Sequence, residues 1–279
     1  MAKNLYGNNV LITGATSGIG LATTLLFSEK GYNVWGVSRF AKTEVPLADN
    51  VTLVKVDVTD EKNVETAIKK IWDDAIAKTK AGIGIVVHCA GFGIGGSAEE
   101  TEHNIALRQF QTNYFGVLNV NRYLLKLMHT QKHSLVLILG SVAGRISIPF
   151  QSHYSATKFA LEAYTEALRI EAKEFGIRAT IIEAGDTKTP FTAKRQIAIN
   201  EDSPYKKQAL LSIKKMEEDE QSGYEPTKVA KVILSIAKRK HPPVRIAVGF
   251  SYKLLLFLKR ILPDCVVEKV LALLYLPKK

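Results

Sequence analysis

The stretch Val10-Leu11-Ile12-Thr13-Gly14-Ala15-Thr16-Ser17-Gly18-Ile19-Gly20 decides the fold of this chain. Residues 10–13 predict a buried strand, and residues 19–30 predict a helix that Gly31 ends. Glycines between a strand and a helix permit a tight turn, and they let backbone N–H groups approach a phosphate at the positive end of the helix dipole. A glycine-rich turn without a ligand is the alternative. We expect a dinucleotide-binding loop, with the contacts Gly14, Thr16, Ser17, Gly18, Ile19 and Gly20.

The rest of the chain repeats this alternation of short β-branched runs and longer helical periods. Further strands are expected at residues 33–38, 51–56, 83–88, 135–139, 177–183 and 244–248, and further helices at 61–79, 103–129, 152–175 and 227–238. Several of the strands are continuous apolar runs, which indicates burial on both faces. The pattern predicts an α/β fold with a doubly wound parallel sheet, a Rossmann fold.

Two regions depart from the alternation. Residues 187–223 are polar and charge-rich, which is typical of a lid over a site or of a solvated surface excursion. Residues 251–279 are apolar with six Lys or Arg and two Asp or Glu, and they predict an amphipathic helical extension. This tail either packs on the protein or lies in a membrane interface, because its pieces are too short to span a bilayer. We expect one domain over residues 1–250, with the lid inside it.

Composition narrows the class of protein. The chain has 279 residues, 46% of them apolar and 23% charged, with a net charge of +11, and this composition excludes a largely disordered chain. Two cysteines, Cys89 and Cys265, indicate neither a disulfide framework nor a metal site. The N-terminus has no signal-peptide pattern, so a cytoplasmic protein is expected, with membrane association left open. The charge permits an anionic partner, but no motif for nucleic-acid binding is present.

The end of the second strand bears on the choice of cofactor. The strand ends Val37-Ser38-Arg39, and the first acidic residue after it is Glu44. A carboxylate at this point would meet a free ribose 2′-hydroxyl, whereas an arginine suits a 2′-phosphate. Ser38 and Arg39 therefore favour NADP(H) over NAD(H). The alternative is that Arg39 is a solvated surface cation.

A tyrosine and a lysine stand one helical turn apart at Tyr154 and Lys158. Residues four apart lie on the same face of a helix, so the phenol and the ammonium are neighbours. A nearby cation is expected to lower the tyrosine pKa towards neutrality, where the phenol can exchange protons. Ser141 follows the apolar strand at 135–139, and ligands bind beyond the carboxyl ends of such strands. Asn113 lies in the long predicted helix and can join this group.

In this combination the chain resembles the short-chain dehydrogenase/reductases over residues 10–248. The resemblance rests on motifs in the right order along the chain: the loop at 13–20, Asp57-Val58, His88-Cys89-Ala90-Gly91, Asn113, Ser141 and the pair Tyr154 and Lys158. Two departures stand out. His88-Cys89 replaces the two asparagines that the family often has, and Ala184-Gly185 replaces a Pro-Gly.

The resemblance implies roles for these residues in hydride transfer. Tyr154 would exchange a proton with the substrate oxygen, and Lys158 would lower the tyrosine pKa and bind the nicotinamide ribose. Ser141 would hold the substrate oxygen, and Asn113 would position a water between Lys158 and solvent. Further cofactor contacts implied by the family are Asp57 and Val58 at the adenine, Ala90 and Gly91 beside the cofactor, and Gly185, Thr187 and Thr189 at the nicotinamide.

Within the family, the chain is most similar to the hydroxysteroid and retinol dehydrogenase branch. This similarity implies an NADP(H)-dependent enzyme that interconverts an alcohol and its carbonyl on a lipophilic substrate. A generic carbonyl reductase of small ketones or aldehydes is an alternative, and a dinucleotide-sensing protein without catalysis is another. The intact set of Asn113, Ser141, Tyr154 and Lys158 argues against the sensor. The family also implies a homodimer or homotetramer.

Overall fold

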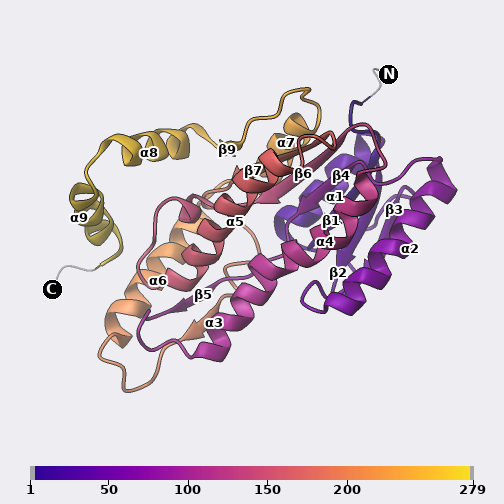
Figure 1. Cartoon of the computed structure of the whole chain (residues 1–279). Helices are drawn as coiled ribbons and strands as arrows, with labels where there is room; N and C mark the ends of the chain where they lie inside the picture. The colour runs from indigo at the N-terminus through magenta and orange to yellow at the C-terminus, as the bar shows by residue number, and fades with distance from the viewer. Residues whose placement is uncertain (1–3, 277–279) are drawn as a thin grey trace.

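A seven-stranded parallel sheet forms the centre of the computed structural model, which describes residues 4–276 (Figure 1). The strand order is β3-β2-β1-β4-β6-β7-β9, and every neighbouring pair is parallel. The strands are β1 (Asn9–Thr13), β2 (Asn33–Ser38), β3 (Val51–Lys55), β4 (Ile85–His88), β6 (Ser134–Leu139), β7 (Ile177–Glu183) and β9 (Arg245–Ala247). The predicted doubly wound α/β fold is confirmed.

Helices cover both faces of this sheet (Figure 1). One face carries α1 (Gly18–Glu29) and α7 (Pro226–Ala237), and the other carries α2 (Glu61–Thr79), α4 (Gly116–Met128) and α5 (Ser152–Glu171). In β1, Leu11 packs into the layer of α2, α4 and α5, whereas Val10 and Ile12 pack into the layer of α1 and α7. Because strand side chains alternate between faces, a continuous apolar run serves both cores. Each such buried side chain contributes roughly 1.5–3 kcal/mol to folding.

The strand order reverses at β1. The chain moves outward from β1 through β2 to β3, and then returns to the other side of β1 to form β4. The loops after β1 and β4 consequently leave the sheet in opposite directions and open a crevice at the carboxyl ends of these strands, where ligands bind in open α/β sheets. Thr13 and His88, the last residues of β1 and β4, are paired at this point.

Two predicted helices differ from the structure in their details. The helix expected over 103–129 consists of α3 (His103–Phe110), a π-helical turn (Gln111–Phe115) and α4. The helix expected over 152–175 ends at Glu171, because the following residues fold into turns in which the Phe175 N–H donates to the Ala172 carbonyl at 3.2 Å. Its predicted end was therefore four residues too late.

The lid region contains structure that the sequence pattern did not predict. A short parallel pair joins β5 (Ile94–Gly96) to β8 (Gln196–Ala198), and α6 (Lys206–Gln221) follows it. The C-terminal extension forms α8 (Phe250–Ile261) and α9 (Asp264–Tyr275), which project beside the rest of the molecule in Figure 1. The last three residues of the predicted extension, 277–279, lie outside the described residues. No helix within residues 4–276 combines the length and the apolarity needed to cross a bilayer.

Candidate functional site

A cleft of about 1850 Å³ lies at the carboxyl ends of the central strands. It receives the loops that follow β1, β2, β4, β6 and β7. With the exception of Asn113, every predicted site residue lines it: Gly14, Thr16, Ser17, Gly18, Ile19, Gly20, Ser38, Arg39, Asp57, Val58, Ala90, Gly91, Ser141, Tyr154, Lys158, Gly185, Thr187 and Thr189. The tertiary structure thus brings together residues that lie as far apart as 14 and 189 in the sequence.

The loop between β1 and α1 is packed too closely for larger residues. Gly14 has a φ of +66°, and a Cβ atom there would lie 2.9 Å from the Ala90 backbone nitrogen. A Cβ on Gly20 would lie 2.1 Å from the Gly14 carbonyl oxygen. The side chain of Ser17, the residue before α1, accepts no capping hydrogen bond from the first turn, so the first N–H groups of the helix stay available to a ligand. A close-packed glycine turn and an uncapped helix start are what a pyrophosphate requires, and the residues present fit a dinucleotide.

The residues predicted for the adenosine end lie at the ends of β2 and β3. The Ser38 hydroxyl is 2.9 Å from the Thr16 hydroxyl, which ties β2 to the glycine-rich loop. Arg39 is exposed in the cleft and has no ion pair with any residue in the described part of the chain. Asp57 accepts hydrogen bonds from the Thr59 N–H at 2.9 Å and from the Thr59 hydroxyl at 2.8 Å. Its carboxylate is thereby fixed at the rim of the cleft.

Tyr154 and Lys158 project from α5 into the same wall of the cleft. The Lys158 Nζ is 5.7 Å from the centre of the Tyr154 ring, and it donates a hydrogen bond to the Leu139 carbonyl oxygen at 2.7 Å. Ser141 lies just beyond β6, where its Oγ accepts a hydrogen bond from the Ala143 N–H at 3.1 Å. The Ser141 hydroxyl can still donate its own proton to a ligand in the cleft. A hydroxyl, a phenol and an ammonium therefore face one space.

Burial dominates the pKa values of the Tyr154 phenol and the Lys158 ammonium. Burial raises the pKa of the Tyr154 phenol to about 12, although a hydrogen bond with Ser141 opposes the shift. Burial also lowers the pKa of the Lys158 ammonium to about 8. Withdrawal from water disfavours the charged form of both groups. Desolvation thus outweighs the contributions that lower the pKa of Tyr154, and a lowering of that pKa by Lys158 stays a prediction.

Asn113 occupies the π-helical turn rather than the cleft wall. Its Oδ1 accepts a hydrogen bond from the Phe92 N–H, and its Nδ2 donates one to the Phe92 carbonyl, both at 3.0 Å. The Nδ2 also donates to the Thr157 hydroxyl at 3.2 Å, on α5 between Tyr154 and Lys158. Asn113 therefore joins the loop after β4 to the helix of the Tyr–Lys pair. π-helical turns within helices frequently mark functional sites.

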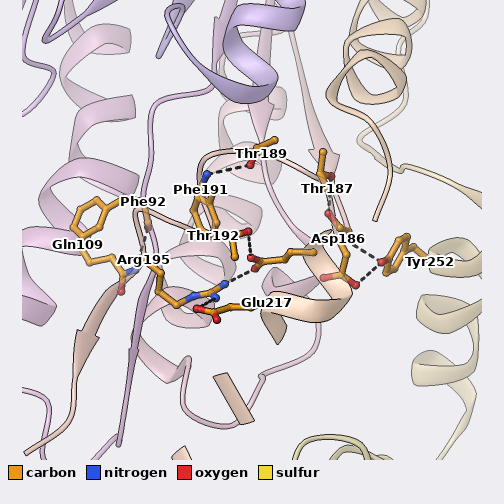
Figure 2. Close-up of polar contacts among 12 residues, drawn as sticks. Phe92, Gln109, Asp186, Thr187, Thr189, Phe191, Thr192, Arg195, Glu217 and Tyr252 are labelled. Atoms are coloured by element: carbon orange, nitrogen blue, oxygen red, sulfur yellow. Dashed lines mark hydrogen bonds and ion pairs between the residues drawn. The ribbon is translucent and has the colours of Figure 1, made fainter. Parts of the chain in front are cut away.

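The lid supplies a wall that sequence reasoning missed. The ring of Phe191 lies edge-on to the Tyr154 ring, with 5.6 Å between their centres. The side chain of Arg195 is fully buried next to this ring and forms an ion pair with Glu220. The Arg195 Cζ lies 5.9 Å from the centre of the Phe191 ring. The Thr192 hydroxyl donates to the same Glu220 at 2.5 Å. Figure 2 shows this polar cluster behind Phe191, which holds the aromatic wall in place.

The C-terminal extension also contributes to the site. The Tyr252 hydroxyl of α8 donates to the Asp186 Oδ2 at 2.6 Å and accepts from the Asp186 N–H at 2.9 Å, as Figure 2 shows. Tyr275, at the end of α9, lines the cleft. The only signal in the sequence was the presence of tyrosines in a segment that is otherwise aliphatic and basic. The extension contacts the body through these side chains, while no residue of α8 or α9 is itself fully buried.

Comparisons of the sequence with known proteins identify its family. The profile of a family described as short chain dehydrogenase matches residues 8–200. The chain is 34% identical over 270 residues to a 3-ketodihydrosphingosine reductase of Bacteroides thetaiotaomicron, covering 95% of this chain and 97% of that protein. It is 33% identical over 272 residues to the probable short-chain type dehydrogenase/reductase VdlC of Helicobacter pylori, covering 96% and 98% of the two chains.

The fold is shared with solved structures. A short-chain dehydrogenase from Streptomyces avermitilis superimposes with a TM-score of 0.78 at 26% identity, covering 94% of this chain and 95% of that one. A short chain dehydrogenase from Burkholderia cenocepacia, solved with NADP, gives a TM-score of 0.75 at 18% identity, covering 95% and 97%. At these identities the second likeness bears on the fold alone.

Proposed function

This chain belongs to the short-chain dehydrogenase/reductase family of oxidoreductases, and from that premise we propose that it interconverts a lipophilic ketone and its alcohol with NADP(H). The observation that carries this proposal is the convergence of Tyr154, Lys158 and Ser141 on the cleft that the glycine-rich loop also lines. A hydroxyl donor, a proton donor and a cation that line one cleft suit the reduction of a C=O group.

Each polar side chain has a distinct task in this proposal. The bound nicotinamide supplies the hydride in reduction and takes it up in oxidation. The Ser141 hydroxyl donates a hydrogen bond to the carbonyl oxygen and orients it. Tyr154 transfers its phenolic proton to that oxygen as the alcohol forms, and Lys158 binds the nicotinamide ribose beside it. Asp57, Val58, Ala90, Gly91, Gly185, Thr187 and Thr189 hold the rest of the dinucleotide. That Asn113 positions a water between Lys158 and solvent stays a prediction.

The protonation of Tyr154 suits the reducing direction. A phenol whose pKa is about 12 keeps its proton at neutral pH, so it is ready to donate that proton to a carbonyl oxygen. In the oxidising direction the phenol would first have to lose the proton, at a cost of about 1.4 kcal/mol for each pH unit below its pKa. We therefore propose that Tyr154 acts as the proton donor in carbonyl reduction near neutral pH.

A preference for NADP(H) rests on the end of β2. Arg39 is exposed in the cleft directly after Ser38, and no carboxylate stands at that point of the strand. A guanidinium without an ion-pair partner can form a bidentate contact with a 2′-phosphate. A free 2′-hydroxyl would gain little from the same group.

A lipophilic substrate is supported by the walls of the cleft beside Tyr154. These walls include the apolar side chains Phe92, Ile148, Phe191 and Met216, and the Tyr275 ring. The name of the Bacteroides relative gives it a long-chain keto lipid as substrate. A steroid-, retinoid- or lipid-like ketone would bury its apolar part against such walls, whereas small ketones or aldehydes would leave most of that surface uncovered.

Turnover with a matched panel of ketones tests the proposal. NADPH oxidation is followed by absorbance with a long-chain 3-ketone, a steroid ketone and a short ketone such as butanone. We expect kcat/KM to rise with the apolar area of the ketone. Equal values for all three would favour the generic carbonyl reductase. Tight NADPH binding without oxidation of NADPH by any ketone would favour the dinucleotide sensor instead.

The C-terminal extension supports peripheral membrane contact as part of this proposal. Large apolar side chains on α8 and α9 are exposed, among them Phe257 at 58% and Leu273 at 69%. Lys253, Lys259, Arg260 and Lys269 lie on the same two helices. Apolar and basic residues combined in this way favour an anionic membrane interface. In flotation with anionic liposomes, we expect the full chain to float and the double variant Phe257→Ser and Leu273→Ser to float less. Equal flotation would remove this part of the proposal.

Self-association is supported by apolar residues on the helices beside the site. Phe115 in the π-helical turn and Phe159 and Ile170 on α5 are exposed at 43%, 42% and 76%. Such a stripe suits a homodimer or homotetramer. Light scattering coupled to size-exclusion chromatography should give a dimer or tetramer for the wild type and a smaller species for Ile170→Asp. A monomeric wild-type chain would contradict this assignment.

A further inference from the structure

Four charged side chains form an ion-pair network next to α5. It lies near the part of the helix that follows Lys158. Arg145 Nη1 lies 3.1 Å from Glu183 Oε1, and Arg245 Nε lies 3.1 Å from Glu162 Oε2. Arg245 Nε is also 3.8 Å from Glu183 Oε1, so the four groups are continuous. The side chains of Glu183 and Glu162 are only 3% and 8% exposed, whereas the two arginines are about one third exposed.

The network joins the segments that carry the candidate catalytic groups. Arg145 directly follows the 3-10 turn (Val142–Gly144) that Ser141 caps. Glu162 is one helical turn beyond Lys158 on α5, and Glu183 ends β7 two residues before Gly185. Arg245 begins β9, which pairs with β7. The ion pairs thus link the turn after Ser141, the helix that carries Lys158 and the strand that leads to Gly185.

Each buried carboxylate depends on its partners. Removing one member of a buried ion pair leaves an uncompensated charge, so such networks fix geometry more than they add stability. Burial, and then the neighbouring Glu183 carboxylate, raise the pKa of Glu162 to about 7, while Arg245 and Arg145 oppose the shift. Glu162 in turn raises the pKa of Lys158 against the effect of burial. Besides Glu162, the titratable groups that face Lys158 are the Tyr154 phenol, whose ring centre lies 5.7 Å from the Lys158 Nζ, and the Cys89 thiol beyond β4.

We propose that Glu162 is a positioning residue for the catalytic pair: through Arg245 and Glu183 it holds α5 against the Ser141 turn, and it presents a carboxylate on the face of α5 that carries Lys158, one helical turn away. The proposal rests on the proposed function, since it gives Lys158 a role that requires its charge. Glu162 touches neither substrate nor cofactor, because it does not line the cleft. Glu166, one further turn along α5, contacts Arg245 from the exposed side and serves as a matched control.

The first test needs no turnover. Competitive acetylation of the full chain across pH, followed by peptide mass spectrometry, gives the pH at which Lys158 becomes reactive. In the wild type this midpoint is expected near the pKa of about 8. Glu162→Gln should move it to lower pH, while Glu166→Gln should leave it in place. Glu162→Asp keeps the carboxylate, so the midpoint of Lys158 acetylation in this variant should lie close to that of the wild type. An unchanged midpoint in Glu162→Gln, or an equal shift in Glu166→Gln, overturns the proposal.

Kinetics with NADPH and the best ketone of the panel provide the second test. We expect Glu162→Gln to lower kcat by about tenfold, as misplaced reacting groups do, with a change of less than about threefold in the KM for NADPH. The alkaline limb of its kcat profile should move to lower pH, in step with the Lys158 midpoint. A fall in kcat at unchanged pH dependence would assign Glu162 a merely structural role. If the wild type has no turnover, the proposed function fails while the acetylation result still decides the link between Glu162 and Lys158.

Discussion

The rings of Tyr154 and Phe191 meet edge to face. Their centres are 5.6 Å apart, and the angle between their planes is 60°. One belongs to α5 and the other to the lid, so the phenol proposed as the proton donor and the aromatic wall of the cleft are in direct contact. An edge-to-face pair contributes about 0.5–1.5 kcal/mol beyond the area that it buries. The lid thus helps to fix the orientation of the phenol as well as to cover the cleft.

Replacing Phe191 by alanine tests this contact. Losing the ring removes an apolar surface next to the carbonyl, so we expect the KM for a long-chain ketone to rise about three- to tenfold. The KM for NADPH should stay the same. Phe175→Ala, which removes an exposed ring stacked on His129, is the matched control. Steady-state kinetics with both substrates provide the measurement, and unaltered values in Phe191→Ala would exclude the ring from the substrate pocket.

Replacing Tyr154 by phenylalanine removes the proton donor and keeps the ring against Phe191. We expect kcat to fall by about 10²- to 10⁴-fold, the usual contribution of a general acid. Binding of NADPH, followed by its fluorescence, should change little. Near-normal turnover in this variant would show that another group donates the proton.

Replacing Arg39 by alanine tests the choice of cofactor. A hydrogen bond to a charged group contributes about 1.5–3 kcal/mol, so NADPH binding should weaken by about 10- to 100-fold. NADH lacks the 2′-phosphate, and its Kd should change far less. Arg122→Ala removes an exposed arginine that pairs with Glu61 and is the control. Equal weakening of both cofactors would mean that Arg39 does not contact the 2′-phosphate.

Gly185 and Tyr252 form a steric pair that anchors α8. A Cβ atom on residue 185 would lie 2.2 Å from the Tyr252 ring, so Gly185→Ala should lower stability by about 1–3 kcal/mol through overpacking. It should also speed proteolysis of α8 and α9. Tyr252→Ala alone loses the hydrogen bonds to Asp186, but it makes room at residue 185. In the Tyr252→Ala background, Gly185→Ala should therefore cause no further loss in the free energy of unfolding. Denaturant unfolding of the two single variants and the double variant measures this. Losses that add up in the double variant would contradict the steric contact.

His88 makes stability depend on pH. Its side chain is buried, Nε2 lies 2.9 Å from Asn121 Oδ1, and burial lowers the pKa to about 4. Between this value and the ordinary pKa near 6.5, the unfolded chain binds a proton that the folded chain does not. Stability should therefore fall as the pH falls, by about 2 kcal/mol from this group between pH 6.5 and pH 5.

Comparison with His88→Gln isolates that contribution. The glutamine keeps a donor for Asn121 but does not titrate, so its free energy of unfolding should fall less steeply over the same pH range. Denaturant titrations at pH 7, 6 and 5 give both slopes. Parallel slopes would indicate that folding does not change the pKa of His88.

Local pattern was sufficient to predict the central sheet and the glycine-rich turn between β1 and α1. A strand such as residues 135–139 consists of apolar residues, and only a strand covered on both faces buries all of them. The π-helical turn at Asn113 was missed because it continues the helical periodicity on both sides. The pair β5 and β8 was missed because two three-residue strands gain most of their stability from each other, about 100 residues apart.

The sequence by itself determined the alternating strands and helices, the glycine-rich turn and the spacing of Tyr154 and Lys158, because each depends on residues that are neighbours along the chain. Only the tertiary structure decided that Phe191 and Tyr275 wall the cleft, that Glu162 reaches Arg245, and that burial raises the pKa of Tyr154. These features depend on packing between distant segments and on the removal of water from charged groups. Neither quantity is encoded in the local order of residues.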